Sequence, residues 1–131
     1  MRFSHIALNC ADIAGAIDFY SRHFGCEVAR RLAIGDGREI VFLRRDDLRL
    51  ELFPTTGPAP ATEGDGPAAA GQLRHIAFEV PDVDAQIARM GPAAVVTMGP
   101  LDFDAFIPGW RTAWLRDPNG HIVEITHGYT D

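Results

Sequence analysis

The chain has 131 residues, enough for one domain or for two small modules that share a core. Hydrophobic residues make up 47% and charged residues 23%, which is typical of a globular protein and excludes a wholly disordered chain. The net charge is −6 and no stretch is basic, so we expect no nucleic-acid partner. No apolar run approaches the ~20 residues of a membrane span, and no signal peptide is evident, so we expect a cytoplasmic protein without membrane contacts.

The first half of the chain predicts a strand, a helix and three further strands. Asp12 is a typical N-cap residue, the apolar residues after it recur at helical spacing, and Gly25 is a typical end signal for the helix. A Gly-Asp-Gly turn and an Arg-Asp-Asp turn separate the strands that follow, at residues 27–34, 39–45 and 48–53. Cys10 and Cys26, at an unremarkable spacing, indicate reduced buried thiols rather than a disulfide.

The second half repeats the first. Residues 75–90 align with residues 5–20, again as a strand, an aspartate N-cap (Asp82) and a helix that ends at Gly91. Further strands are expected at residues 93–98, 112–116 and 121–127, with a Gly/Pro-interrupted loop over residues 99–109. We therefore predict an α+β fold of two tandem βαβββ modules that form a curved mixed-sheet cup, with modules at residues 1–53 and 73–131 and a Pro/Gly/Ala-rich linker at 54–72.

The repeat places the same two residue types on each module. Because strand side chains alternate between faces, His5 and Glu51 should lie on the face away from the helix in the first module, as should His75 and Glu124 in the second. Two such sheets facing each other would bring together two imidazoles and two carboxylates, which suit a divalent transition metal. Each side chain taken alone is more typical of a structural histidine or a solvated glutamate. Their pairing by the repeat favours the metal site.

At these residues the chain resembles the vicinal oxygen chelate superfamily, which includes glyoxalase I, extradiol dioxygenases and bleomycin resistance proteins. The motifs that carry the resemblance are the first strand with His5 and the segments DIAGAIDFYSRHFG, RLELF, RHIAFEVPDVDA and DPNGHIVEI. The His/Glu/His/Glu set resembles glyoxalase I most closely. The resemblance implies a divalent transition metal (Ni, Zn, Fe, Mn or Co) held by these four side chains.

For function, the resemblance implies a glyoxalase-like lyase or isomerase that transfers a proton through a metal-bound enediolate of a small oxygen-chelating substrate. Glu124 is the expected base, with Glu51 opposite it. The resemblance also implies a homodimer with sites shared between chains. Two alternatives stay open: an extradiol-type dioxygenase, and a non-catalytic protein that binds small molecules or confers antibiotic resistance.

Several other residues are candidates for substrate binding. An apolar wall would come from aromatic side chains, each of which could equally be an ordinary core residue, namely Phe53, Phe103, Phe106, Trp110 and Trp114. Arg49 and Arg111 could bind an anionic group, or simply be solvated. Asn9 stands where bacterial glyoxalase I has an arginine near the glutathione carboxylate, which argues against a glutathione adduct as substrate.

Overall fold

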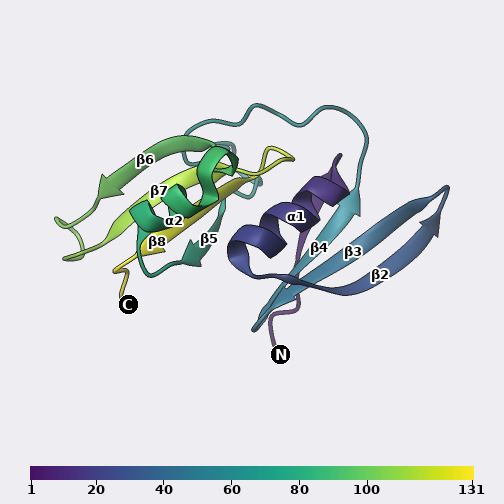
Figure 1. Ribbon diagram of the computed structural model, residues 1–131, viewed down its shortest axis with the longest axis horizontal. Helices are drawn as coiled ribbons and strands as arrows, with labels where there is room; N and C mark the ends of the chain where they lie inside the picture. The colour runs from purple at the N-terminus through teal and green to yellow at the C-terminus, as the bar shows by residue number, and fades with distance from the viewer. The chain divides into compact units, whose positions relative to one another are not determined.

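The computed structural model describes residues 1–131, and the chain divides into two compact units, Met1–Pro60 and Ala61–Asp131. Each unit consists of a four-stranded mixed sheet and one α-helix (Figure 1). The predicted α+β fold of two tandem βαβββ modules is therefore confirmed. Neither helix is long and apolar enough to cross a lipid bilayer.

The first unit has the strand order β1-β4-β3-β2. Its elements are β1 (Ile6–Cys10), α1 (Ile13–Phe24), β2 (Glu27–Gly35), β3 (Arg38–Arg45) and β4 (Leu48–Pro54). The Asp12 side chain accepts a hydrogen bond from the Gly15 backbone N–H at 2.8 Å, and Gly25 ends α1 with φ +66°, as the sequence predicts. The first strand pairs in parallel with the last one, which places their side chains next to each other at the edge of the sheet.

The second unit has the equivalent order β5-β8-β7-β6. Its elements are β5 (Ile76–Glu79), α2 (Val83–Met90), a 3-10 turn η1 (Gly91–Ala93), β6 (Val96–Asp102), β7 (Arg111–Arg116) and β8 (Ile122–His127). Asp82 caps α2 by accepting a hydrogen bond from the Ala85 N–H at 2.9 Å. As in the first unit, the opening strand β5 pairs in parallel with the closing strand β8.

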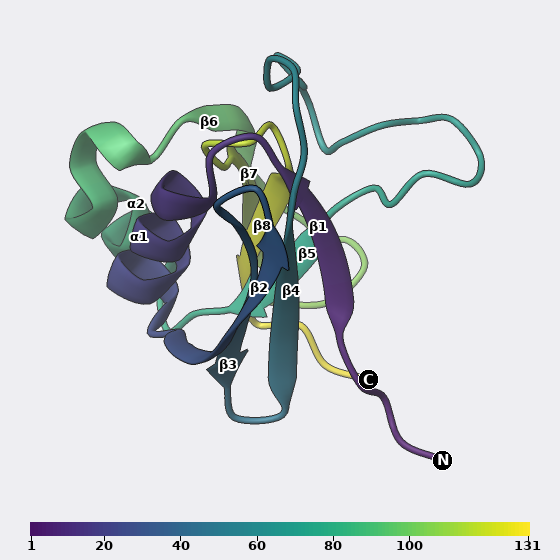
Figure 2. The ribbon, with the colours of Figure 1, turned by 90° about the vertical axis from the view of Figure 1, so that its right-hand side faces the viewer.

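In each unit the helix covers one face of its own sheet, and the hydrophobic core of that unit lies between the helix and the sheet. Figure 2 shows α1 on one side of the strands of the first unit. The sheet residues that point toward the helix are fully buried, at 0% exposure: Val41, Leu43, Leu50 and Leu52 in the first unit, and Ala113, Leu115, Val123 and Ile125 in the second. The intervening residues of the same strands therefore face away from the helix.

The strand predicted at residues 93–98 lies further along the chain. Residues 91–93 form the 3-10 turn, and β6 covers Val96–Asp102, so it includes Pro100 and part of the predicted loop. A proline lacks the backbone N–H that a central strand needs, but β6 is the edge strand of its sheet and its pairing with β7 is irregular between Met98 and Leu101. An edge position and a bulge are the two places where a sheet tolerates proline.

Part of the region predicted as a linker is bound to the second unit. We call residues 62–66 the strap. Arg116 donates hydrogen bonds to the Thr62 carbonyl and the Glu63 carboxylate, both at 3.0 Å, and the Thr97 hydroxyl donates to the Gly64 carbonyl at 2.7 Å. Apart from Pro54, the last residue of β4, residues 54–72 form no helix or strand. The composition of this segment does not indicate which side chains bind the carbonyl groups of the strap.

Candidate functional site

In the first unit, His5 and Glu51 lie together. Ala7 is the residue of β1 that pairs with Glu51 on β4, and His5 lies two residues earlier on the same face. The His5 Nε2 atom is 3.2 Å from Glu51 Oε2, and its Nδ1 atom is 2.9 Å from the Ser4 hydroxyl. The ring also makes an edge contact with Phe42, with the two centroids 5.6 Å apart.

The second unit repeats this arrangement with His75 and Glu124. Ala77 pairs with Glu124 in the parallel register of β5 and β8, so the spacing between the histidine and the paired residue is the same as in the first unit. His75 Nε2 is 2.8 Å from Glu124 Oε2. Strand alternation therefore predicts that each histidine and glutamate share a face, and the parallel pairing of the strands explains why they are in contact.

The second ring nitrogen of His75 identifies the tautomer. Its Nδ1 atom lies 2.8 Å from the backbone carbonyl oxygen of Asp65 in the strap. A carbonyl oxygen can only accept, so Nδ1 carries the hydrogen and Nε2 of the neutral ring carries a lone pair. That lone pair faces a carboxylate oxygen, and two acceptors at this distance repel each other unless a proton or a cation lies between them. A carbonyl that fixes the outer nitrogen in this way is typical of a metal-binding histidine.

The distances also suit a metal ion. Two ligand atoms bound at about 2.1 Å and at right angles to each other lie about 3.0 Å apart. The two His–Glu separations, 2.8 Å and 3.2 Å, fall on either side of this value. Two imidazole nitrogens and two carboxylates match the ligand preference of divalent Ni, Zn, Fe, Mn and Co. Each unit contributes two of the four predicted ligands.

Thr112 is a neighbour of the candidate site that the sequence did not single out. Its hydroxyl lies 2.6 Å from Glu124 Oε1, where it donates, and it is also 3.0 Å from the Ile125 carbonyl. Thr112 is fully buried and Glu124 is only 8% exposed, so this contact fixes one carboxylate oxygen while the other faces His75. In the first unit the corresponding position of β3 is Ile40, and Glu51 lacks this partner. Strand alternation across the β7–β8 hairpin was the signal that could have identified Thr112.

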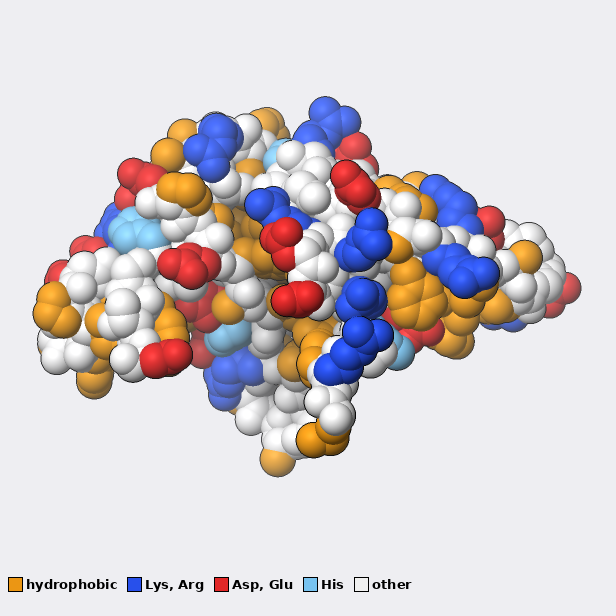
Figure 3. Space-filling model, turned by 90° about the horizontal axis from the view of Figure 1, so that it is seen from below, with side chains coloured by type: hydrophobic (Ala, Val, Ile, Leu, Met, Phe, Trp, Pro, Cys, Tyr) orange, Lys and Arg blue, Asp and Glu red, His pale blue; other side chains and the backbone are white.

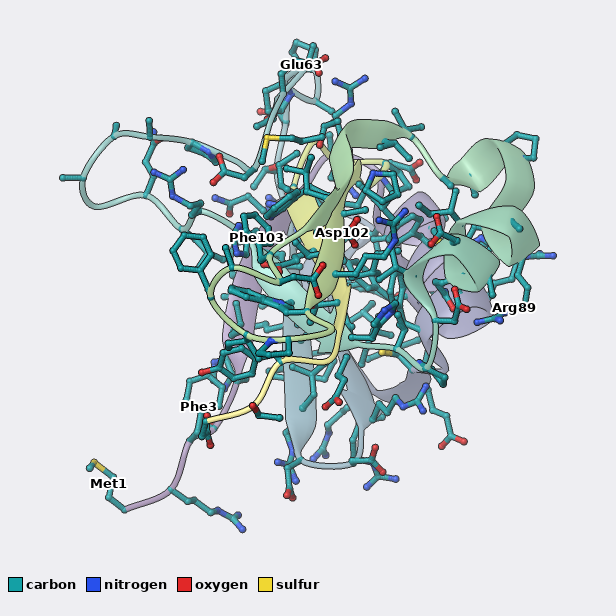
Figure 4. The ribbon with its side chains drawn as sticks, turned by 90° about the vertical axis from the view of Figure 1, so that its left-hand side faces the viewer. Met1, Phe3, Glu63, Arg89, Asp102 and Phe103 are labelled. Carbon is teal, nitrogen blue, oxygen red and sulfur yellow. The ribbon has the colours of Figure 1, made fainter.

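Three of the predicted aromatic residues form a chain of ring contacts that begins at His75. The Trp114 ring is 6.2 Å from His75 and 6.4 Å from Phe103, and Phe103 packs on Trp110 at 5.0 Å. Figure 4 shows Phe103 on one side of the β6 ribbon and Arg89 of α2 on the other. These rings therefore lie on the face of the sheet that points away from the helix.

The remaining candidates lie elsewhere. Phe53 pairs with Asn9 across β1 and β4 on the face of Glu51, and Phe53 is 40% exposed. The structure does not bring Arg111 to the corresponding face of the second unit. Its guanidinium donates to the carboxylates of Asp84 at 2.8 and 3.0 Å and of Asp102 at 2.9 Å. These bonds raise the pKa of Arg111 and lower that of Asp84.

Arg49 lies on the face of Glu51 in the first unit. It pairs across the sheet with Arg44, so two like charges are direct neighbours on this face. Figure 3 shows arginine side chains in a row on one side of the molecule, with acidic and hydrophobic side chains beside them. The mixture of both charge signs is in keeping with the absence of a basic stretch in the sequence.

Comparisons with known proteins agree with this architecture. The cadmium-induced protein CadI of Mycobacterium tuberculosis is 29% identical over 123 residues, which cover 92% of this chain and 72% of that protein. The lactoylglutathione lyase of Pseudomonas aeruginosa is 28% identical over 146 residues, covering 94% of this chain and 80% of that protein.

Among solved structures, the fosfomycin resistance protein FosX of Listeria monocytogenes, complexed with Mn(II) and sulfate, has the same fold. Its TM-score is 0.70 at 19% identity, over 98% of this chain and 93% of that one. The sequence profile of the Glyoxalase/Bleomycin resistance protein/Dioxygenase superfamily matches residues 2–125. The chain therefore belongs to this superfamily, as the motifs around its histidines and glutamates predict.

Proposed function

We propose that the protein is a metal-dependent lyase or isomerase of the glyoxalase type, which transfers a proton within a small substrate that chelates through neighbouring oxygens. The observation that carries this proposal is the repeated His–Glu pair, 3.2 Å apart in one unit and 2.8 Å in the other. Each pair brings one imidazole nitrogen and one carboxylate oxygen into direct contact. The similarity to a lactoylglutathione lyase over 94% of the chain supports the same class of reaction.

The four proposed ligands are His5, Glu51, His75 and Glu124. A divalent ion held there would polarise a substrate carbonyl and offset the negative charge that develops when the adjacent carbon loses its proton. Four protein ligands would leave positions on such an ion for two substrate oxygens or for one oxygen and a water molecule.

The protein's own part in the reaction is the movement of the proton. Glu124 is the proposed base: Thr112 holds its Oε1 atom, and its Oε2 atom, which faces His75, would turn to the substrate carbon, take its proton and return it to the neighbouring carbon. Glu51, which has no hydroxyl partner, is the second carboxylate of the site. The aromatic rings of Phe103 and Trp110 would exclude water from the substrate and protect it from side reactions.

The experiment is a metal and activity analysis of the wild type and the variant Glu124→Gln. We expect the wild type to bind one divalent ion per pair of units. It should also exchange with deuterium, in D2O, the hydrogen next to the carbonyl of 2-hydroxyketones or of 2-oxoaldehyde hemithioacetals, which NMR follows. Glu124→Gln should retain metal and lose at least a hundredfold of the exchange rate. Glu27→Gln, on an exposed position of β2, makes the same chemical change away from the site and should exchange at the wild-type rate.

Three outcomes would contradict the proposal. Full exchange by Glu124→Gln with its metal retained would exclude Glu124 as the base. Oxygen uptake with catechols by the iron-loaded protein would indicate a dioxygenase. A protein that binds no divalent metal would be a small-molecule binding protein rather than an enzyme of this type.

We further propose a homodimer in which each site takes its histidines from two chains. Mixing the variants His5→Gln and His75→Gln tests this arrangement. In a dimer with shared sites, one of the two sites of a mixed dimer combines two wild-type units, so metal binding and activity should partly return. If each chain builds its site alone, every site carries one substitution and nothing is recovered.

A further inference from the structure

The indole N–H of Trp114 is the only buried side-chain nitrogen or oxygen atom in the structure that has no hydrogen-bond partner. Trp114 is 5% exposed, so its donor is cut off from bulk water. Leaving a buried donor unsatisfied costs about 1–3 kcal/mol, and a native protein rarely does so without a reason. The other tryptophan shows the usual solution, because Trp110 donates its N–H to the Thr126 hydroxyl at 2.8 Å.

The unsatisfied donor lies beside the candidate metal ligands. Trp114 is the residue of β7 that pairs with Glu124 of β8, so the two side chains share one face of the sheet. Its ring makes an edge contact with the ring of His75, with centroids 6.2 Å apart. The N–H therefore belongs to the immediate surroundings of the His75–Glu124 pair.

The repeat shows that this position does not need a donor for folding. In the first unit the equivalent residue is Phe42, which pairs with Glu51 and makes an edge contact with His5 at 5.6 Å. An aromatic ring thus lies next to each of the two histidines, and only the ring of the second unit carries a polar atom. Packing explains the ring in both units, whereas it does not explain the N–H.

We propose that the Trp114 indole N–H is a hydrogen-bond donor to an oxygen atom of the molecule that binds at the His75–Glu124 pair. The oxygen would be a carbonyl or hydroxyl group, and the apolar part of the ligand would lie against Phe103, whose ring is 6.4 Å from Trp114. Phe103 directly follows β6, and its backbone N–H donates to the Trp110 carbonyl at 2.8 Å. This inference rests on the proposed function, and it assigns one residue that selects for an oxygen acceptor next to an apolar group.

The first test uses the protein without ligand. If the N–H is reserved for a ligand, Trp114→Phe loses only packing contacts. Benzothienylalanine has the same shape as tryptophan but carries sulfur in place of the N–H, so at position 114 it should leave the melting temperature unchanged or raise it. The isostere is introduced in a Trp110→Phe background, so that position 114 alone carries it. Trp110→Phe provides the contrast, because it removes an N–H that has a partner and should lower the melting temperature.

The second test measures ligand binding by the Co(II)-loaded protein, with benzohydroxamate as the probe, because it combines two chelating oxygens with an aromatic ring. Replacing the Trp114 indole by benzothienylalanine should weaken probe binding about tenfold, as expected for one lost hydrogen bond in a buried site, while Co(II) affinity stays within about twofold. The visible Co(II) spectrum reports both constants in one titration.

The outcomes separate this inference from the proposed function. Equal probe affinity in the isostere and its tryptophan parent, with Co(II) bound by both, would overturn the role of Trp114 and leave the metal site standing. A marked loss of melting temperature in the unliganded isostere would also overturn it, because the N–H would then serve the fold. A wild-type protein that binds neither Co(II) nor the probe would overturn the proposed function and this inference together.

Discussion

Gly66, the last residue of the strap, can be changed to test how the second unit orients His75. Its φ angle is +117°, and a Cβ atom at this position would lie 1.8 Å from the Arg74 carbonyl oxygen. Neither atom belongs to a flexible side chain, so the backbone itself has to move. Because Asp65 precedes Gly66, this movement pulls away the carbonyl that holds His75 Nδ1 at 2.8 Å.

The chain provides a matched control in Gly71. Its φ is +85°, and a Cβ atom there would meet nothing within 4 Å. Alanine at either position costs about 1 kcal/mol for the positive φ. Gly66→Ala should also break the His75–Asp65 and Thr97–Gly64 hydrogen bonds, which adds about 2 kcal/mol. At about 4 °C per kcal/mol for a chain of this size, we expect a fall in melting temperature of about 12 °C against about 4 °C for Gly71→Ala.

Metal affinity provides the second readout. Loss of the group that orients a metal-binding histidine typically weakens metal binding by about 10–100-fold. Calorimetric titration with Zn(II) should show this loss for Gly66→Ala and wild-type affinity for Gly71→Ala. Equal melting temperatures and equal Zn(II) affinities for the two variants would refute the conclusion that the strap positions His75.

Three smaller effects follow from other contacts. Thr112→Val removes the hydroxyl that holds Glu124 Oε1 and should lower turnover about tenfold in a steady-state assay while metal stoichiometry is retained; unchanged turnover would exclude an orienting role. Burial raises the pKa of the Cys26 thiol, so a disulfide reagent should react with it only as fast as the protein unfolds, and rapid reaction of the folded protein would contradict this. Hydrogen bonds from Arg111 lower the pKa of Asp84, so the stability that they provide is present above the ordinary carboxyl pKa of 3.8 and is lost as the pH falls below it. The stability of Asp84→Asn, measured by acid unfolding, should therefore fall less over this pH range than that of the wild type, and an equal fall would contradict this.

The sequence predicts the local structure well, because the signals for it are themselves local. Asp12 and Asp82 cap the two helices, and Gly25 and Gly91 follow their ends, as the spacing indicates. A helix needs only a cap, an apolar stripe and an end signal, and all of these lie within a dozen residues of one another. The internal repeat adds the fold class, because one βαβββ pattern occurs twice.

The His–Glu pairs depend both on the local sequence pattern and on the tertiary structure. Strand alternation assigns His75 and Glu124 to one face, but the distance of 2.8 Å between them follows from the parallel pairing of β5 with β8, two strands that are far apart in the chain. Arg111, a candidate for substrate binding, is by contrast separated from the face of Glu124 by alternation along β7 alone, and it pairs with Asp84 of α2. It lies one residue from Thr112 on β7, and adjacent strand residues point to opposite faces.

The sequence alone therefore determined the helix boundaries, the repeat and the residues of the candidate site, since each follows from short-range patterns. Only the tertiary structure decided which atoms those residues touch. The strap carbonyl on His75, the Thr112 hydroxyl on Glu124 and the unsatisfied N–H of Trp114 all depend on contacts between segments that are distant in the chain. A hydrogen bond needs a partner at a defined distance and angle, and no local pattern of residues specifies that partner.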